Sequence, residues 1–161
     1  MNMPYIYDAA LYLRLSKNDM EEESAKSESN SIVKQRVLLW SFVKSRSDIQ
    51  IFDIYVDDGC SGGNFARSEL KRMTTDIESG KGNCVNVKDL FRFGREYIEA
   101  GRWIEKIYPA LNVRFISVCD NYDSFAPGAK NQELSMNIKN LANDAYAKDI
   151  SAKKRAAKHI A

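Results

Sequence analysis

This chain of 161 residues has few of the residue types that the common catalytic and metal sites need. It contains one histidine, His159, and three cysteines, Cys60, Cys84 and Cys119, none of them in C-x-x-C spacing. A zinc site needs a cluster of such ligands, and a Ser-His-Asp hydrolase needs a histidine base near its serine. We therefore expect no metal, no other cofactor and no hydrolase triad.

Long apolar runs are also missing. No run approaches the roughly 20 residues that span a bilayer. The first residues, MNMPYIYDAALYLRLS, lack a basic start and a small-residue cleavage site. We expect a cytoplasmic protein that has no membrane partner. Because 44% of the residues are hydrophobic, the chain can bury the core of one ordinary domain.

The net charge of +2 does not indicate a partner, but the charge is unevenly distributed. Basic residues gather near the end of the chain, and the cluster consists of Lys153, Lys154, Arg155 and Lys158. Such a cluster has two interpretations. It is either the solvated face of a helix or a contact with the phosphate backbone of a nucleic acid.

Short apolar runs alternate with amphipathic stretches along the chain. Predicted strands cover residues 9–15, 49–56, 83–88 and 113–118; predicted helices cover residues 30–45, 68–79, 96–109 and 131–158; predicted loops cover residues 57–67 and 121–130. This alternation predicts an α/β fold with a mostly parallel sheet of four to five strands flanked by helices. We divide the chain into an α/β domain of residues 1–130 and a long C-terminal helix within residues 131–161.

Polar and charged residues follow three of the predicted strands. Ser16 follows the first strand, Asp57 the second and Arg92 the third. The carboxyl ends of parallel strands share one edge of the sheet, where ligands of α/β proteins bind. We therefore expect these side chains to converge.

Arginines are the most informative members of this set. Arg14, Arg67, Arg92 and Arg95 each lie at a strand end or in the glycine-rich loop. Their planar guanidinium groups match phosphate oxygens and stabilise a phosphoryl transition state. A serine hydroxyl is a weak nucleophile, so it would need this charge or a carboxylate such as Asp57.

Nucleotide binding has weaker support, because the chain has neither a G-K-[ST] phosphate loop nor a G-x-G-x-x-G motif. A small-molecule phosphohydrolase remains an alternative. It would turn over a phosphate ester in the absence of DNA.

Five motifs occur in an order that resembles the resolvase/invertase family of serine recombinases, most of all its large subgroup. They are YLRLS at 12–16, SNSIVKQR at 29–36, YVDDGCSGGNFAR at 55–67, VKDLFRFGRE at 87–96 and VRFISVCDNYDS at 113–124. The resemblance implies the family's α/β fold. It also implies site-specific recombination of double-stranded DNA through a 5′-phosphoserine intermediate.

The resemblance also implies roles for individual residues. Ser16 would be the nucleophile, and Arg14, Arg92 and Arg95 would bind the scissile phosphate. Gln35, Ser61 and Arg67 match accessory positions of the active site. We add Asp57 to these accessory residues because a carboxylate at this strand end could assist the serine.

Partners follow from the same resemblance. The family works as a homodimer that pairs into a tetramer, and a long helix leads its basic end onto DNA. Residues 131–158 match that helix. Large members continue into DNA-reading regions that this sequence does not contain.

One position departs from the family. Phe91 stands before Arg92 where relatives have Asp or Ser. The alternative to an active enzyme is therefore a catalytically impaired module that dimerises or binds DNA.

Overall fold

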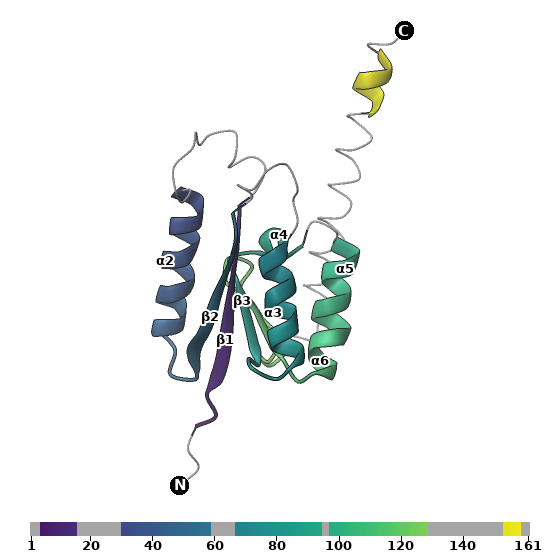
Figure 1. Cartoon of the computed structure of the whole chain (residues 1–161). Helices are drawn as coiled ribbons and strands as arrows, with labels where there is room; N and C mark the ends of the chain where they lie inside the picture. The colour runs from purple at the N-terminus through teal and green to yellow at the C-terminus, as the bar shows by residue number, and fades with distance from the viewer. Residues whose placement is uncertain (1–3, 16–29, 59–66, 95–96, 129–152, 159–161) are drawn as a thin grey trace.

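Five strands form a single sheet in the computed structural model, which describes residues 4–15, 30–58, 67–94, 97–128 and 153–158. The strands are β1 (Tyr7–Arg14), β2 (Ile49–Asp57), β3 (Cys84–Val87), β4 (Arg114–Ser117) and β5 (Tyr122–Asp123). Their order across the sheet is β2-β1-β3-β4-β5 (Figure 1). The first four are parallel, and β5 runs antiparallel to β4. The predicted mostly parallel sheet is confirmed.

Helices cover both faces of this sheet. One face carries α2 (Asn30–Lys44). The other carries α3 (Ser68–Glu78), the short α4 (Leu90–Phe93) and α5 (Tyr97–Arg102), which continues through a π-helical turn, η1 (Trp103–Ile107), into α6 (Tyr108–Ala110). In Figure 1, α3 and α5 lie side by side, and α2 lies away from them, beyond β2. The predicted α/β class is therefore correct.

The central strand β1 shows why two helical layers are needed. Successive side chains of a strand point to opposite faces of the sheet. Tyr12 packs in one core cluster with Met73 of α3, whereas Leu11 packs in the other with Leu39 of α2. All four side chains are fully buried. A strand that is apolar on both sides is typical of a parallel sheet that helices cover on each face.

Three features differ from the sequence prediction. The four-residue helix α4 is too short to show a helical period and was not predicted. β5 lies inside the predicted loop of residues 121–130, where its two residues pair with the end of β4. The predicted helix of residues 96–109 is helical from Tyr97 to Ala110 but contains the π-helical turn. Gly80 follows the end of α3 with a positive φ of 79°, a conformation typical of a glycine after a helix.

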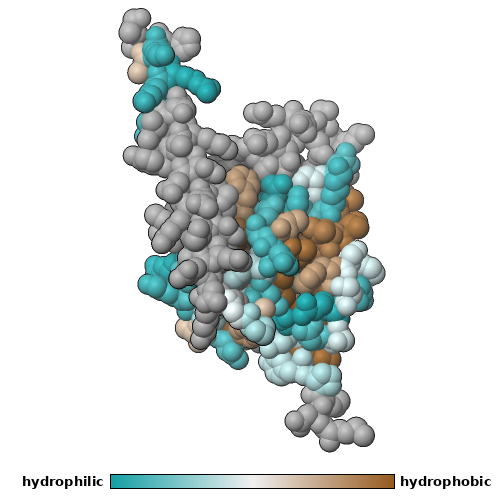
Figure 2. Space-filling model, turned by 180° about the vertical axis from the view of Figure 1, so that it is seen from behind, coloured by the Kyte–Doolittle hydropathy of each residue, from teal (hydrophilic) through white to brown (hydrophobic). Residues whose placement is uncertain are grey.

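Most of the long helix predicted for residues 131–158 lies outside the described residues. Its described part, residues 153–158, is helical and exposed. The side chains of this part are mainly hydrophilic in the view from behind (Figure 2). No helix among the described residues is both long enough and apolar enough to cross a membrane.

Candidate functional site

The carboxyl ends of the parallel strands meet at one edge of the sheet, which we call the carboxyl edge. Arg14, the last residue of β1, pairs in register with Asp57, the last residue of β2. Beyond them, the Leu15 amide donates to the Asp57 carbonyl at 3.1 Å. On the other side of β1, β3 leads through Asp89 into α4. The predicted convergence of strand ends therefore brings Arg14, Asp57 and Arg92 to a common edge.

The short helix α4 carries Arg92 and is held by caps at both ends. Asp89 adopts an extended N-cap conformation, and its Oδ1 accepts from the Arg92 amide at 2.8 Å. Gly94 follows the last turn, and its amide donates to the Leu90 carbonyl at 3.2 Å. A helix of one turn has almost no stability of its own. The position of Arg92 therefore depends on the groups that bind the ends of α4.

Two arginines bind the carbonyl end of α4. Arg14 donates from Nε to the Arg92 carbonyl at 2.9 Å and from Nη2 to the Phe91 carbonyl. Arg67 donates from Nη1 to the Phe93 carbonyl at 3.1 Å. Cations are favourable at the C-terminal end of a helix, where carbonyl groups lack partners within the helix. These bonds draw three of the predicted phosphate-binding arginines, Arg14, Arg67 and Arg92, around one turn of helix.

The main chain of Arg14 is fixed from the other side of the sheet by Gln35 of α2. The Gln35 side chain accepts from the Arg14 amide at 3.3 Å and donates to the Arg14 carbonyl at 3.0 Å. Gln35 is only 1% exposed, and its Nε2 also donates to the Ser31 hydroxyl. A glutamine that replaces two ladder hydrogen bonds holds the end of β1 in place. This is a physical reason for a polar residue at a core position of α2.

Asp57 caps the N-terminus of α3. Its carboxylate accepts from the amides of Glu69 and Leu70, each at 3.1 Å, and from the Tyr12 hydroxyl at 2.9 Å. Burial, reinforced by this carboxylate, raises the pKa of Tyr12 far above its ordinary value, so the hydroxyl stays a donor. Asp57 thus fixes α3 to the sheet, and any role in proton transfer would compete with these three bonds.

An exposed aromatic ring lies close to two of the arginines. The Phe91 side chain is 43% exposed. Its ring centroid is 5.7 Å from the Arg14 Cζ and 6.0 Å from the Arg92 Cζ. Arg92 is itself 8% exposed, with Nε and Nη1 buried. The ring therefore borders both guanidinium groups on the solvent side of α4.

Three predicted site residues lie outside the described residues: Ser16, Ser61 and Arg95. Ser16 is joined in sequence to Leu15, which is described and lies at the carboxyl edge. The basic residues Lys153, Lys154, Arg155 and Lys158 are described, and all four are exposed on the helical segment 153–158. Their predicted contact with DNA stays a prediction.

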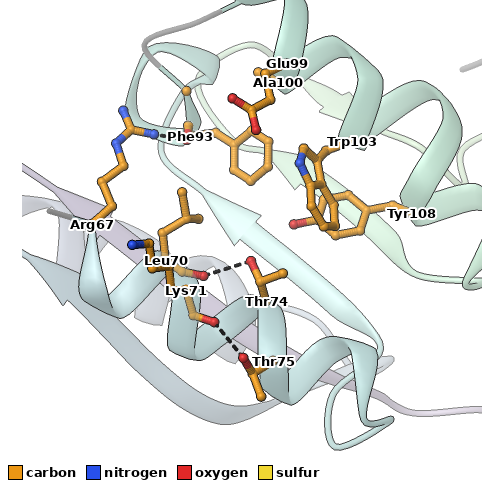
Figure 3. A pocket seen from close by; sticks show the side chains of 11 residues that line it. Arg67, Leu70, Lys71, Thr74, Thr75, Phe93, Glu99, Ala100, Trp103 and Tyr108 are labelled. Carbon is orange, nitrogen blue, oxygen red and sulfur yellow. Dashed lines mark hydrogen bonds between the residues drawn. The ribbon is translucent and has the colours of Figure 1, made fainter.

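A cavity of about 580 Å³ opens between α3 and the helix formed by α5 and η1. Its walls are mostly apolar, from Leu70, Phe93, Trp103 and Tyr108, and Arg67 lies at its rim (Figure 3). The Arg67 Nη2 atom is buried and has no hydrogen-bond partner among the described residues. The cavity therefore adjoins the arginine cluster through Arg67.

The arginine cluster at α4 is suited to an anion. Arg14 and Arg67 donate to carbonyl oxygens, and a phosphate oxygen is a stronger acceptor than a carbonyl. Several fixed guanidinium groups near one point can offset the charge of a phosphoryl transition state. Sequence reasoning found the arginines but missed α4 and its cap Asp89. An Asp before an apolar pair was the available signal.

Comparison with known proteins identifies relatives of this domain. The sequence profile of the family "Resolvase, N terminal domain" matches residues 9–161. No curated protein is significantly similar to the chain.

Solved structures agree with the profile. A resolvase family site-specific recombinase from Streptococcus pneumoniae has a TM-score of 0.64 and 26% identity, over 94% of each chain. The N-terminal catalytic domain of TP901-1 integrase has a TM-score of 0.62 and 23% identity, over 89% of this chain and 98% of that one. The catalytic domain of ISC1926 TnpA, an IS607-like serine recombinase, has a TM-score of 0.51 and 20% identity, over 69% of each chain. The last two likenesses concern the fold alone.

Proposed function

The chain belongs to the family of resolvase N-terminal domains, and from this premise we propose that it is the catalytic domain of a serine recombinase acting on double-stranded DNA. The observation that carries the proposal is the gathering of Arg14, Arg67 and Arg92 around α4, at the sheet edge where β1 leads toward Ser16. Such a cluster supports binding of a phosphodiester. The likeness to a site-specific recombinase at 26% identity supports recombination as the reaction class.

In the proposed reaction, the Ser16 hydroxyl attacks the scissile phosphorus. The new bond joins Ser16 Oγ to phosphorus, and the bond between phosphorus and the 3′ oxygen breaks. The serine proton ends on that oxygen, which leaves a free 3′-hydroxyl and a 5′-phosphoserine link. The link conserves the energy of the phosphodiester, so religation needs no metal or high-energy cofactor.

The arginines have the main electrostatic role in this proposal. Arg14 and Arg92, with Arg95 from the same segment, would bind the non-bridging oxygens and offset the charge of the pentacoordinate phosphate. Preorganisation by α4 supports this role, because donors that are fixed before reaction need no reorganisation during it. Gln35 and Asp57 support it by fixing β1 and α3. Arg67 and Ser61 are proposed as accessory residues.

The proposed assembly is a homodimer that forms a tetramer on paired DNA sites. We propose residues 1–130 as the catalytic domain and residues 131–161 as a helix for dimerisation and DNA approach. The exposed basic side chains of residues 153–158 support contact with the DNA backbone, because such contacts come mainly from Lys and Arg.

Covalent trapping tests the proposed function. The protein is incubated with a random-sequence duplex DNA library, stopped with detergent and resolved by denaturing electrophoresis. The natural chain is expected to give protein attached to 5′ DNA ends, and Ser16→Ala is expected to give none. An adduct that persists in Ser16→Ala would refute Ser16 as nucleophile. No adduct with the natural chain would contradict an active enzyme.

A catalytically silent module for dimerisation or DNA binding is the second candidate. It is favoured by Phe91, whose ring borders two arginines and whose carbonyl accepts from Arg14. Phe91→Ser in the same trapping assay separates the candidates. Adducts formed only by the variant would favour the silent module, whereas adducts formed by both proteins would favour the active enzyme.

A further inference from the structure

The turn after β4 brings an acidic residue, Asp120, to the N-terminus of α4. Hydrogen bonds extend the pairing of β3 and β4 past their ends, from the Val118 amide to Val87 and from the Cys119 amide to Lys88. Asn121 then closes the turn with a φ of 51°, a left-handed conformation that asparagine tolerates better than most residues. The turn is therefore tied to the segment that leads into α4.

The Asp120 carboxylate makes two short hydrogen bonds there. Its Oδ2 accepts from the Leu90 amide at 2.8 Å and from the Ser117 hydroxyl at 2.6 Å. Ser117 is fully buried, so its hydroxyl is a fixed donor that orients the carboxylate. Leu90 is the first residue of α4, and its amide has no partner within the helix. Asp120 thus satisfies the first amide of α4, while Asp89 satisfies the amide of Arg92.

The helix depends on these caps because it has only four residues. A shift of α4 would displace Arg92 directly. It would also displace the Phe91 and Arg92 carbonyls that hold the Arg14 guanidinium. Two carboxylates at one end and two guanidinium groups at the other therefore fix α4 along its axis.

We propose that Asp120 is a positioning residue for strand cleavage: oriented by Ser117, it fixes α4 and thereby Arg92. The inference rests on the proposed function, but its structural part can be measured separately. Asp120 touches α4 and Ser117 and not the reacting atoms, so its effect should pass through Arg92.

Hydrogen exchange tests the structural part without requiring activity. In Asp120→Ala, exchange of the α4 amides is expected to accelerate at least about tenfold, with the sheet amides unchanged, because local opening costs less free energy. Glu78→Ala is the control. It removes an exposed acid at the end of α3 and leaves the buried ion pairs of Arg114 intact. Unchanged α4 exchange in Asp120→Ala, or equal acceleration in the control, overturns the proposal whether or not the chain cleaves DNA.

Cleavage kinetics test the functional part. If the natural chain forms the covalent adduct, Asp120→Ala is expected to slow single-turnover adduct formation by about ten- to a hundredfold. DNA affinity is expected to change by less than about threefold. Asp120→Asn retains an acceptor oxygen for Leu90, so it should recover most of the rate. Equal rates for Asp120→Ala and the natural chain, or no recovery in Asp120→Asn, contradict the positioning role.

A double variant tests whether Asp120 influences cleavage through Arg92. If Asp120 acts through Arg92, adding Asp120→Ala to Arg92→Ala should slow cleavage by less than about threefold further, because the two changes are not independent. If the double variant slows cleavage by the product of the two single effects, the effect of Asp120 does not pass through Arg92. Absence of any adduct with the natural chain refutes the proposed function and leaves the hydrogen-exchange result to decide whether Asp120 fixes α4.

Discussion

Arginines at opposite edges of this sheet have different partners. At the amino edge, where β4 begins, Arg114 is 5% exposed and donates to two carboxylates, Asp48 at 2.8 Å and Asp123 at 3.0 and 2.5 Å. At the carboxyl edge, Arg14 and Arg67 donate to main-chain carbonyls of α4. Asp48 and Asp123 offset the charge of Arg114 within the fold, which gives this edge a structural role. The carbonyls of α4 hold the guanidinium groups of Arg14 and Arg67 beside Arg92, an arrangement that is suited to bind an anion.

The electrostatics of the amino edge agree with this contrast. Hydrogen bonds from Arg46 and Arg114 hold the pKa of Asp48 well below its usual range. Bonds to Asp123 and Asp48 raise the pKa of Arg114 above its ordinary value. The Tyr7 ring, 4.9 Å from the Arg114 Cζ, covers the same guanidinium. Substitutions at this edge should therefore reduce stability, and substitutions at the other edge should reduce catalysis.

The largest expected effect is on cleavage. Arg92→Ala should lower the rate of adduct formation by about 10²- to 10³-fold, because a positioned donor to the reacting phosphate is lost. Single-turnover trapping measures the rate, and the exposed Arg102→Ala serves as a control that should match the natural chain. A rate unchanged by Arg92→Ala would remove this arginine from the proposed site.

The next effect is on folding. Arg114→Ala should lower the free energy of unfolding by about 3 kcal/mol, because Asp123 loses the buried cation that it binds and Asp48 keeps, among the described residues, only its bond to Arg46. Denaturant unfolding measures the loss. Adduct formation per folded molecule should not change. A large loss of activity without a loss of stability would reverse the roles assigned to the two edges.

A smaller loss of unfolding free energy is expected for Tyr12→Phe. This change removes the hydroxyl that donates to Asp57 and should cost about 1 kcal/mol in unfolding free energy. Tyr55→Phe is the matched comparison, since its hydroxyl donates to Asp76 on α3 and its ring lies against Arg72, which is not part of the arginine cluster at α4. The two variants should lose similar stability, but only Tyr12→Phe should slow cleavage. Equal cleavage rates for both variants would show that the hydrogen bond from Tyr12 to Asp57 does not affect the proposed active site.

The smallest effect is a pH dependence at the amino edge. The pKa of Asp48 is lower in the fold than in the unfolded chain, where it is about 3.9. The stability it contributes is therefore present above about pH 4 and is lost as the pH falls toward the folded pKa. Asp48→Asn should flatten the decline of unfolding free energy below pH 4. An unchanged slope would contradict the depressed pKa.

The sequence predicted the sheet because each strand is a short apolar run bounded by polar loops. It also predicted that Arg14, Asp57 and Arg92 share an edge, since strand ends in parallel sheets meet. What the residues do there was harder to predict. The sequence suggested Asp57 as a possible catalytic carboxylate. In the structure, its carboxylate accepts hydrogen bonds from two amides at the start of α3.

Contacts between residues that are distant in sequence explain why the rest of the site and fold could not be predicted. Arg114 and Arg14 look alike in sequence, but among the described residues Arg114 binds Asp48 and Arg14 binds the α4 carbonyls. These partners are more than 60 residues distant in the chain. α4 and β5 are too short to produce a periodic pattern. The roles of Ser16, Ser61 and Arg95 remain predictions, as they lie outside the described residues.

Nuclear magnetic resonance of the arginine side chains tests the contrast between the edges most directly. Ser16→Ala protein, which should bind DNA without cutting it, is titrated with duplex DNA while the Nε–H signals are followed. The signals of Arg14 and Arg92 should shift on binding, and that of Arg114 should stay in place. A shift confined to Arg114, with Arg14 and Arg92 unmoved, would contradict the assignment of the phosphate to the carboxyl edge.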